Sequence, residues 1–351
     1  MKAKNVKEVK IKDITLGGNN PVLIQSMCNT KTKNITSTNK QIKELENAGC
    51  DLIRVAVPDI ETAQILPKIK KDMKVPLIGD IHFDYRIAIE ASKHCDKIRI
   101  NPGNIGRWEH VCSVIENAKK NDCAIRIGVN MGSLSKECEK EMGRTPKAMV
   151  KSALEYINFF EKNNFKKIVV SLKSSDVLTS IYANRMFREK SSYPLHIGIT
   201  EAGTKEEGAI KSSIGIGTLL ADGIGETIRV SLTADPTEEI PVAKSILKFL
   251  NRGNFGRTII SCPTCARTHG KLIDIAKEVE KKTKHINKPL KIAIMGCEVN
   301  GPGEAKDADF GVALGKDSAY LFKNGEVTKK VMFEQITKEL LKEINTGENV
   351  S

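Results

Sequence analysis

The sequence predicts an α/β fold, a (β/α)8 TIM barrel followed by a smaller α+β domain. Short apolar runs alternate with amphipathic stretches in the first part of the chain, the pattern of a parallel sheet with helices between its strands. Eight such units fit within roughly 220 residues, as a barrel of this class requires. The series ends at NRGNFGR, residues 251–257, whose two glycines and two asparagines are typical of a linker.

Amphipathic elements precede and separate the apolar runs. A short hairpin is expected first, within VKEVKIKDITLGG. A helix is expected next, because Thr38 and Gln41 have the spacing of a capping box, an apolar stripe follows, and Gly49 can end the helix. MVKSALEYINFFEKN, residues 149–163, also places apolar side chains at helical spacing. Such stretches are the expected outer helices.

Each apolar run is short and ends in polar residues, as barrel strands do. An open, doubly wound sheet is the alternative arrangement of the same units. Its dinucleotide fingerprint is absent, since GIGTLL at 215–220 has Leu220 where the third glycine belongs. The predicted strands lie in residues 21–27, 51–57, 75–83, 96–104, 123–130, 166–176, 194–203 and 225–236.

The stretch TEEIPVAKSILKFLNRG is predicted to form the helix that closes the barrel. We therefore expect a barrel domain over residues 1–250 and a second domain over 251–351. The second domain is expected to contain the strand TIIS, the helix RTHGKLIDIAKEVEKK, the strand LKIAIMG and a hairpin turning at Asn324-Gly325. A last helix should place four apolar residues on one face, namely Phe333, Ile336, Leu340 and Ile344.

The composition limits the class of protein. No apolar run is long enough to span a membrane, and the basic start MKAKNVKEVKIKD lacks the apolar core of a secretion signal, so a cytoplasmic location is expected. The net charge of +13 indicates an anionic partner. Nucleic acid is not favoured, because aromatic residues make up only 5% and do not interleave with the basic ones. Six of the nine cysteines are scattered singly, as buried thiols of a reducing compartment are.

Polar side chains gather at the predicted carboxyl ends of the strands, where barrels of this class have their active sites. Five of them are cations from five different strands. An arginine flanked by isoleucine and valine is costly to bury unless it is paired. The residues at the strand ends are Arg54, Asp80, His82, Arg99, Asn101, Arg126, Asn130, Ser171, Lys173, His196, Thr200, Glu201, Arg229, Ser231 and Thr233.

These cations outnumber the acids that could neutralise them. One interpretation is that the arginines pair with neighbouring carboxylates, but the strand ends carry few, mainly Asp80 and Glu201. An anionic ligand accounts for the excess, because the guanidinium fork matches phosphate oxygens. Five cations suit a diphosphate better than a single carboxylate.

Three cysteines of the second domain have metal-ligand spacing. Cys262 and Cys265 stand in SCPTCART, and Cys297 stands in GCEVNGPGEA. Glu304 is the favoured fourth ligand, because the Gly-Pro-Gly turn can return it to Cys297, whereas Glu298 follows Cys297 directly and should point to the opposite face. The chemistry leaves open an iron–sulfur cluster, structural zinc or a metal-free thiol site.

Several motifs in order resemble one known family. SCPTCART and MGCEVNGPGEA, with PVLIQSM, DLIRVAVP, GDIHFDYR, IRINPGN, IRIGVN, PLHIGITEAG and IRVSLTADP, are similar to 4-hydroxy-3-methylbut-2-enyl diphosphate synthase of the methylerythritol phosphate route to isoprenoids, in its bacterial two-domain form. The resemblance covers nearly the whole chain. It implies a [4Fe–4S] cluster and the substrate 2-C-methyl-D-erythritol 2,4-cyclodiphosphate, which is opened reductively by two electrons with loss of water.

The resemblance also implies roles for individual residues. Asp80 and His82 would shape the pocket for the ring, Glu201 would orient or protonate the departing hydroxyl, and Glu304 would hold the exchangeable iron that binds the substrate oxygen. The cluster would be held by Cys262, Cys265, Cys297 and Glu304. The diphosphate would be held by Arg54, Arg99, Arg126, Asn130, Lys173, Arg229 and Ser231.

Partners are implied as well. Electrons should come from ferredoxin or flavodoxin, because the chain has no flavin or nicotinamide motif. A head-to-tail homodimer is expected, because the helix after the eighth strand returns the chain to the amino-terminal face of its own barrel. Two alternatives stay open: a zinc-stabilised RNA-binding protein, and a cluster-free phosphate-binding barrel similar to dihydropteroate synthase.

Overall fold

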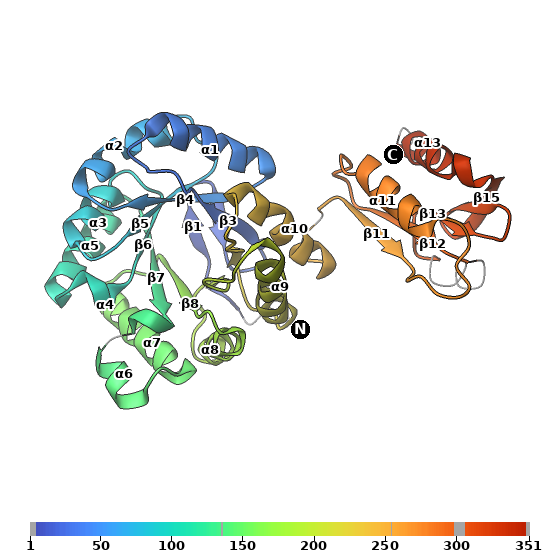
Figure 1. Cartoon of the computed structure of the whole chain (residues 1–351). Coiled ribbons are helices and arrows are strands. Elements are labelled where there is room, and N and C mark those ends of the chain that lie inside the picture. The colour runs from blue at the N-terminus through green and yellow to red at the C-terminus, as the bar shows by residue number, and fades with distance from the viewer. Residues whose placement is uncertain (1–4, 135, 254, 298–305, 349–351) are drawn as a thin grey trace. The chain divides into compact units, whose positions relative to one another are not determined.

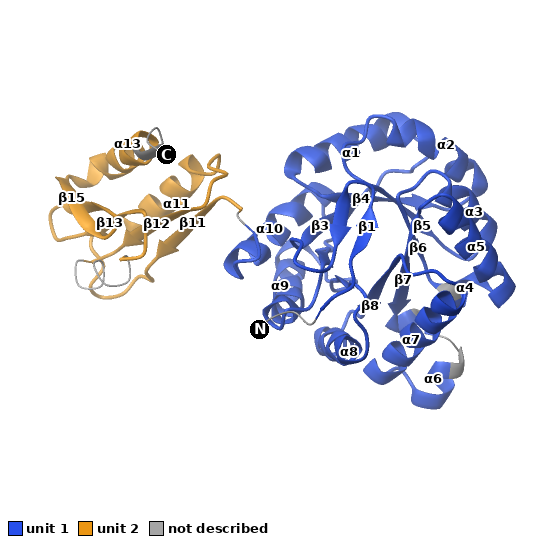
Figure 2. Ribbon diagram, turned by 180° about the vertical axis from the view of Figure 1, so that it is seen from behind, with its two compact units in different colours: residues 1–253 blue, residues 254–351 orange. Residues whose placement is uncertain are grey.

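The computed structural model describes residues 5–134, 136–253, 255–297 and 306–348. The chain divides into two compact units, residues 1–253 and residues 254–351 (Figure 2). Each has its own sheet and its own core. Among the described residues, none of the helices combines the length and the apolar composition that crossing a bilayer requires.

Unit 1 is a barrel of eight parallel strands in the order β8-β7-β6-β5-β4-β3-β10-β9. A parallel bridge between Val170 and Leu195 joins β8 to β9 and completes the ring. The predicted TIM barrel is therefore confirmed, and the doubly wound alternative is wrong. The strands are β3 (Leu23–Met27), β4 (Leu52–Val57), β5 (Leu77–Ile81), β6 (Lys97–Ile100), β7 (Ala124–Asn130), β8 (Ile168–Lys173), β9 (His196–Ile197) and β10 (Thr227–Ile228).

Helices surround these strands as an outer ring (Figure 1). Alternating residues of each strand face this ring and most of them are apolar; on β4 they are Ile53, Val55 and Val57, all buried. The opposite face of β4 points into the barrel and carries Arg54. The helices are α1 (Ile35–Ala48), α2 (Ile60–Lys70), α3 (Tyr85–Ser92), α4 (Pro102–Ile105), α5 (Trp108–Lys120), α6 (Lys136–Met142), α7 (Pro146–Lys162), α8 (Val177–Lys190), α9 (Lys205–Ala221) and α10 (Glu239–Phe249).

The expected amino-terminal hairpin closes one end of the barrel. Its strands are β1 (Val9–Ile11) and β2 (Ile14–Leu16), which pair antiparallel. Their buried apolar side chains pack on Ala124 and Val169, near the starts of β7 and β8. The hairpin thereby covers the starts of these strands with apolar contacts, so a polar ligand is expected at the carboxyl ends.

The first helix begins differently from its prediction. Asn34 caps it, with its side-chain oxygen accepting a hydrogen bond from the Ser37 backbone N–H at 3.1 Å. Thr38 lies inside the helix, where it is buried and its hydroxyl lies 2.9 Å from that of Thr30. The predicted capping box is therefore wrong, although Gly49 ends the helix in a left-handed conformation as expected.

In the described residues of unit 2, a five-stranded mixed sheet in the order β11-β12-β13-β14-β15 is accompanied by the two helices α11 and α13. The first three strands are parallel and the last two antiparallel. The hairpin turns at Asn324 and Gly325 as predicted, both with positive φ. The elements are β11 (Arg257–Ser261), α11 (Leu272–Lys282), β12 (Leu290–Met295), β13 (Phe310–Leu314), β14 (Ala319–Lys323), β15 (Glu326–Val331) and α13 (Ile336–Glu348).

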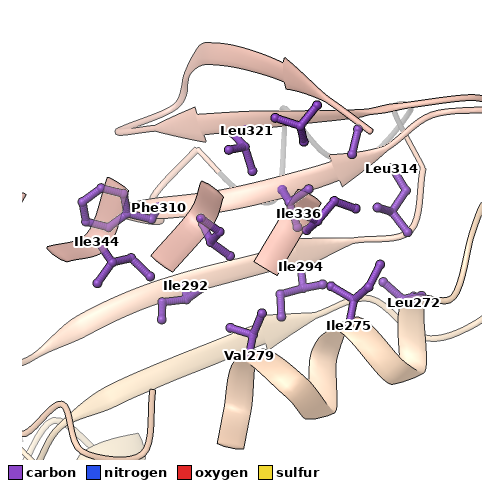
Figure 3. Packing of buried hydrophobic residues seen from close by; sticks show 14 of the residues in the cluster. Leu272, Ile275, Val279, Ile292, Ile294, Phe310, Leu314, Leu321, Ile336 and Ile344 are labelled. Atoms are coloured by element: carbon purple, nitrogen blue, oxygen red, sulfur yellow. The ribbon is translucent and has the colours of Figure 1, made fainter. Parts of the chain in front are cut away.

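Both helices of unit 2 bury apolar side chains against the sheet. Figure 3 shows Leu272, Ile275 and Val279 of α11 pointing toward Ile294 of β12. The last helix contributes three residues that the sequence predicted on one face, Ile336, Leu340 and Ile344. This core fixes the ends of β11 and β12, which Cys262 and Cys297 follow.

Candidate active site

The predicted cations lie inside the carboxyl-terminal half of the barrel. Arg54 is on β4, Arg99 on β6, Arg126 on β7 and Lys173 on β8, and Arg229 directly follows β10. Neighbouring strands place them in register: Arg99 lies opposite Arg126. Parallel partners share a face of the sheet, so these side chains converge on one interior.

Asp80 is the carboxylate at the centre of this group. Its carboxylate oxygens lie 3.5 Å from Arg99 Nη1, 3.9 Å from Arg54 Nε and 3.2 Å from His82 Nε2. Burial alone would raise the pKa of Asp80, but Arg54, the hydrogen bond from His82 and Arg99 together hold that pKa well below its usual range. Asp80 therefore stays ionised and neutralises one of its two arginine neighbours.

Arg229 pairs with a carboxylate that the sequence did not indicate. Glu239, the first residue of α10, accepts hydrogen bonds from Arg229 Nη2 at 3.3 Å and Nε at 3.4 Å. Glu239 is buried and also accepts a hydrogen bond from the Ser26 hydroxyl at 2.8 Å. The second acid of the cluster is thus Glu239 and not Glu201.

Arg54 and Arg229 both contact the sulfur atom of a methionine. Met27, at the end of β3, lies with its Sδ 3.0 Å from Arg54 Nε and 3.6 Å from Arg229 Nη1. A thioether is a weak acceptor. These guanidinium groups therefore have capacity for a stronger, anionic acceptor.

Arg126 and Lys173 have no carboxylate of their own in the part of the chain that the structure describes. Neither forms an ion pair with any residue that the structure describes, and Nε and Nη1 of Arg126 have no hydrogen-bond partner there. Burial, followed by repulsion from Arg54 and Arg99, lowers the pKa of Arg126 well below its ordinary value. Burial, followed by Arg126 and Arg229, does the same to the pKa of Lys173. A bound polyanion would relieve both effects.

Two glycines leave room for the cations. A methyl group at Gly128 would lie 2.6 Å from Arg99 Nε, and one at Gly198 would lie 2.8 Å from Lys173 Nζ. Both distances are shorter than any ordinary contact. The missing side chains therefore allow the Arg99 and Lys173 chains to cross the interior.

The other predicted residues lie around the rim. Asn130 ends β7 opposite Lys173, Ser231 follows β10 and is partly buried, and His82 is half-exposed. Glu201 is exposed, in a turn after β9 with a left-handed φ of 52°. Among the described residues, no hydrogen bond or ion pair joins Glu201 to the cation cluster. The structure thus brings together the cations, Asp80 and His82, and leaves Glu201 outside their contacts.

A deeper group of polar residues was missed from the sequence. Lys97 on β6 and Gln25 on β3 are buried inside the barrel below the predicted cations. His196 on β9, which was considered but given no role, lies 2.9 Å from the Thr227 hydroxyl through Nδ1. Lys97 could have been found, because it precedes Arg99 by two residues and must share its face.

The cysteines of unit 2 follow the ends of two neighbouring parallel strands. Cys262 follows β11, and its Sγ accepts a hydrogen bond from the Gly296 N–H at 3.0 Å. Cys297 is buried next to Gly296, just after β12. Cys265 is exposed; hydrogen bonds from the backbone of Arg267 and the hydroxyl of Thr268 lower its pKa.

The predicted fourth ligand cannot be placed. Glu304 and Glu298 lie in residues 298–305, outside the described part of the chain. Within the described residues, no three cysteine, histidine or acidic side chains are close enough together to bind one metal ion. The structure does bring Cys262 beside the Gly296-Cys297 segment, and Cys265 lies in the same loop as Cys262.

Comparison with known families covers both units. One family model, described as the GcpE TIM-barrel domain, matches residues 6–244, and a second, described as the GcpE protein C-terminal domain, matches residues 258–346. The chain belongs to the GcpE family. The resemblance noted in the sequence motifs is thereby confirmed, and the TIM barrel is the fold that the GcpE model carries.

Curated GcpE relatives match over almost their full length. The protein from Caldanaerobacter subterraneus subsp. tengcongensis is 54% identical over 343 residues, which are 97% of each chain. The protein from Clostridium perfringens is 52% identical over 348 residues, 99% of this chain and 100% of the relative. Both relatives are named 4-hydroxy-3-methylbut-2-en-1-yl diphosphate synthase (flavodoxin).

A solved structure supports the fold of unit 1 alone. Type I 3-dehydroquinate dehydratase from Clostridium difficile superposes with a TM-score of 0.52 at 16% identity and covers 71% of this chain and all of that enzyme. The identity is too low to carry function. The structural superposition thus agrees with the family model, which describes this domain as a TIM barrel.

Proposed function

We propose that this chain converts 2-C-methyl-D-erythritol 2,4-cyclodiphosphate to 4-hydroxy-3-methylbut-2-enyl diphosphate by a two-electron reductive ring opening with loss of water. It is an oxidoreductase of isoprenoid precursor biosynthesis, in keeping with the names of its GcpE relatives. The observation that carries the proposal is the buried cation cluster, whose positive charge exceeds the negative charge of its carboxylates, Asp80 and Glu239. Neither the RNA-binding nor the cluster-free alternative accounts for a GcpE C-terminal domain.

The barrel cations bind the diphosphate in this proposal. Arg126 and Lys173 supply charge without a carboxylate partner, and Arg54 and Arg229 exchange the Met27 sulfur for phosphate oxygens. Charge-assisted hydrogen bonds of this kind are short and strong. Arg99 is held by Asp80 and contributes from the same face, and Asn130 and Ser231 at the rim add neutral donors.

Asp80, His82 and Glu201 act on the ring of the substrate. Asp80 fixes Arg54 and Arg99 and, through its hydrogen bond, orients the half-exposed His82 imidazole at the mouth. Glu201 stands on the turn that follows β9, from which a carboxyl group can orient or protonate the departing hydroxyl. Its left-handed backbone fixes the direction in which that turn leaves the strand.

Cys262, Cys265 and Cys297 would hold a [4Fe–4S] cluster with Glu304 as the fourth ligand. The donor chemistry fits: the Gly296 N–H already donates to Cys262 Sγ, as backbone groups do around cluster thiolates, and Thr268 donates toward Cys265. When bound, such a cluster supplies single electrons and a Lewis-acidic iron. The chain's own part is to hold three thiolates at the ends of β11 and the adjacent β12 and to provide one exchangeable carboxylate.

The partners follow from the same reaction. A flavodoxin supplies the electrons, as the names of the relatives indicate. Two chains form a head-to-tail homodimer, because α10 runs back from the carboxyl ends of the strands and unit 2 begins only a few residues after it. Each active site then takes its cations from one chain and its cluster from the other.

The direct test is turnover of the cyclodiphosphate by anaerobically purified protein with an artificial reductant. We expect the 4-hydroxy-3-methylbut-2-enyl diphosphate product and a visible absorption shoulder from the cluster. Arg126→Met should lose turnover and keep the shoulder, whereas Lys70→Met, which removes an equal charge from outside the barrel, should keep both. Iron-loaded protein that fails to consume the substrate would refute the proposal.

A further inference from the structure

A second polar layer lies deeper in the barrel than the predicted cations. Lys97 precedes Arg99 by two residues on β6, so both side chains face the interior. In register, Lys97 lies opposite Ile78 of β5 and Ala124 of β7, and Ala124 itself packs on the amino-terminal hairpin. Lys97 therefore has apolar neighbours at its own level of the barrel, and the predicted cations lie nearer the carboxyl ends of the strands.

Buried polar atoms without partners surround this layer. Lys97 Nζ, both side-chain polar atoms of Gln25, Nε2 of His196 and two guanidinium nitrogens of Arg126 have no hydrogen-bond partner among the described residues. All four residues are more than nine-tenths buried and come from four different strands. Buried polar groups are normally satisfied, so these atoms point to an occupant of the interior.

The charges facing Lys97 are almost all positive. Arg126 faces it from β7, Arg54 from β4 and the neutral His196 from β9, whereas the hairpin below buries Val9, Ile11 and Leu16 against the strands. Burial, then Arg126 and Arg54, lower the pKa of Lys97 well below its ordinary value, and the Cys123 thiol acts in the opposite direction. Of the carboxylates, Asp80 is already shared by Arg54 and Arg99.

We propose that Lys97 forms the inner end of the anion site and becomes an additional cation against the diphosphate, with Gln25 and His196 hydrogen-bonding beside it. The inference rests on the proposed function for the identity of the anion. A polyanion bound at the carboxyl-terminal side of Lys97 reverses the sign of the local potential. The four-carbon stem of the lysine lets its ammonium group extend toward that anion. Binding should then draw a proton from solution.

The test is calorimetric titration of the full-length protein with inorganic pyrophosphate at pH 8, in buffers of different ionisation enthalpy. The variants are Lys97→Met, which keeps an unbranched side chain without the ammonium group, and Lys70→Met as the matched control. Lys70 pairs with Asp96, just before β6, on the outside of the barrel. We expect Lys97→Met to weaken pyrophosphate binding roughly 10- to 100-fold, because a charge-assisted contact is removed, and to take up fewer protons on binding than the wild type.

A structural role alone predicts a different result. If Lys97 only fills the interior beside ordered water, Lys97→Met will bind pyrophosphate as the wild type does, with the same proton uptake, and the inference is wrong. Thermal unfolding checks the fold, since replacing an unpartnered buried amine by an apolar chain should not lower the melting temperature. Pyrophosphate binding needs no turnover, so a chain that binds through Lys97 and leaves the cyclodiphosphate unchanged would refute the proposed function and leave this inference standing.

Discussion

Replacing Asp80 with Asn removes the central carboxylate of the cation cluster and keeps its shape. Two guanidinium groups and one imidazole then face each other without a counterion, at a position whose side chain is 8% exposed. With an effective dielectric constant of about 20, each arginine at 3.5 to 3.9 Å contributes a gross attraction of roughly 4–5 kcal/mol. Breaking a buried pair from one side costs about 3–5 kcal/mol net.

That loss should appear as a lower melting temperature. For a barrel of this size, 1 kcal/mol corresponds to about 2–4 °C, so we expect a fall of roughly 6–20 °C at pH 7. Because the pKa of Asp80 is lower in the folded than in the unfolded chain, its contribution is fully present above the unfolded value near 3.9 and is lost as the pH falls further. The gap between wild type and Asp80→Asn should therefore close at acid pH.

Pyrophosphate gives the assay a second arm. The variant carries one more uncompensated positive charge, so pyrophosphate should raise its melting temperature more than that of the wild type; at 100 times the dissociation constant the stabilisation is about 2.7 kcal/mol. Glu61→Gln removes an equal charge from an exposed pair with Lys33 and should change neither result. Unfolding of Asp80→Asn at the wild-type temperature, with an equal response to pyrophosphate, would show that Asp80 is not the counterion of this cluster.

Four further changes test separate parts of the site. Gly128→Ala should push Arg99 off Asp80 and weaken pyrophosphate binding about 10-fold, whereas Gly217→Ala, which meets no atom within 4 Å, should leave binding unchanged in the same titration. Cys297→Ser should lose iron and turnover together, and normal iron content would remove that thiol from the ligand set. Glu304→Ala should keep the colour and lose turnover, which spectra and product analysis separate. Mixing Arg126→Met with Cys297→Ser under subunit exchange should restore activity in mixed dimers, and zero activity in proven mixed dimers would place each site within one chain.

The sequence was sufficient for the barrel because the outer face of each strand is apolar and each strand end is polar. Arg126 illustrates this: an arginine inside a run of isoleucine and glycine has few explanations besides a polar interior. Lys97 was missed because only the ends of strands were considered, although its two-residue spacing from Arg99 was readable. The sequence could show that the cations converge, but not how deep the polar layer extends.

Other parts of the site depend on packing that no local pattern reveals. Glu239 opens a helix, and its contact with Arg229 exists only once α10 has packed beside β3. Glu201 looked equivalent in the sequence, yet its turn leaves it exposed. The cap of α1 shows the same limit at short range, since Asn34 and Thr38 are both good caps and the contact of Thr38 with Thr30 decides between them.

The hairpin that seals the barrel has a consequence for synthesis of the chain. Its apolar residues, ending at Leu16, leave the ribosome first, but Val169, on which they pack, follows about 150 residues later, roughly 8–30 s at ordinary elongation rates. An isolated two-stranded hairpin is marginally stable in water. Until β7 and β8 emerge, the nascent chain therefore presents an apolar segment without its native partner, which is the kind of segment that chaperones bind. The contacts that close the barrel form later still, because β10 must be synthesised before it can pair with β3.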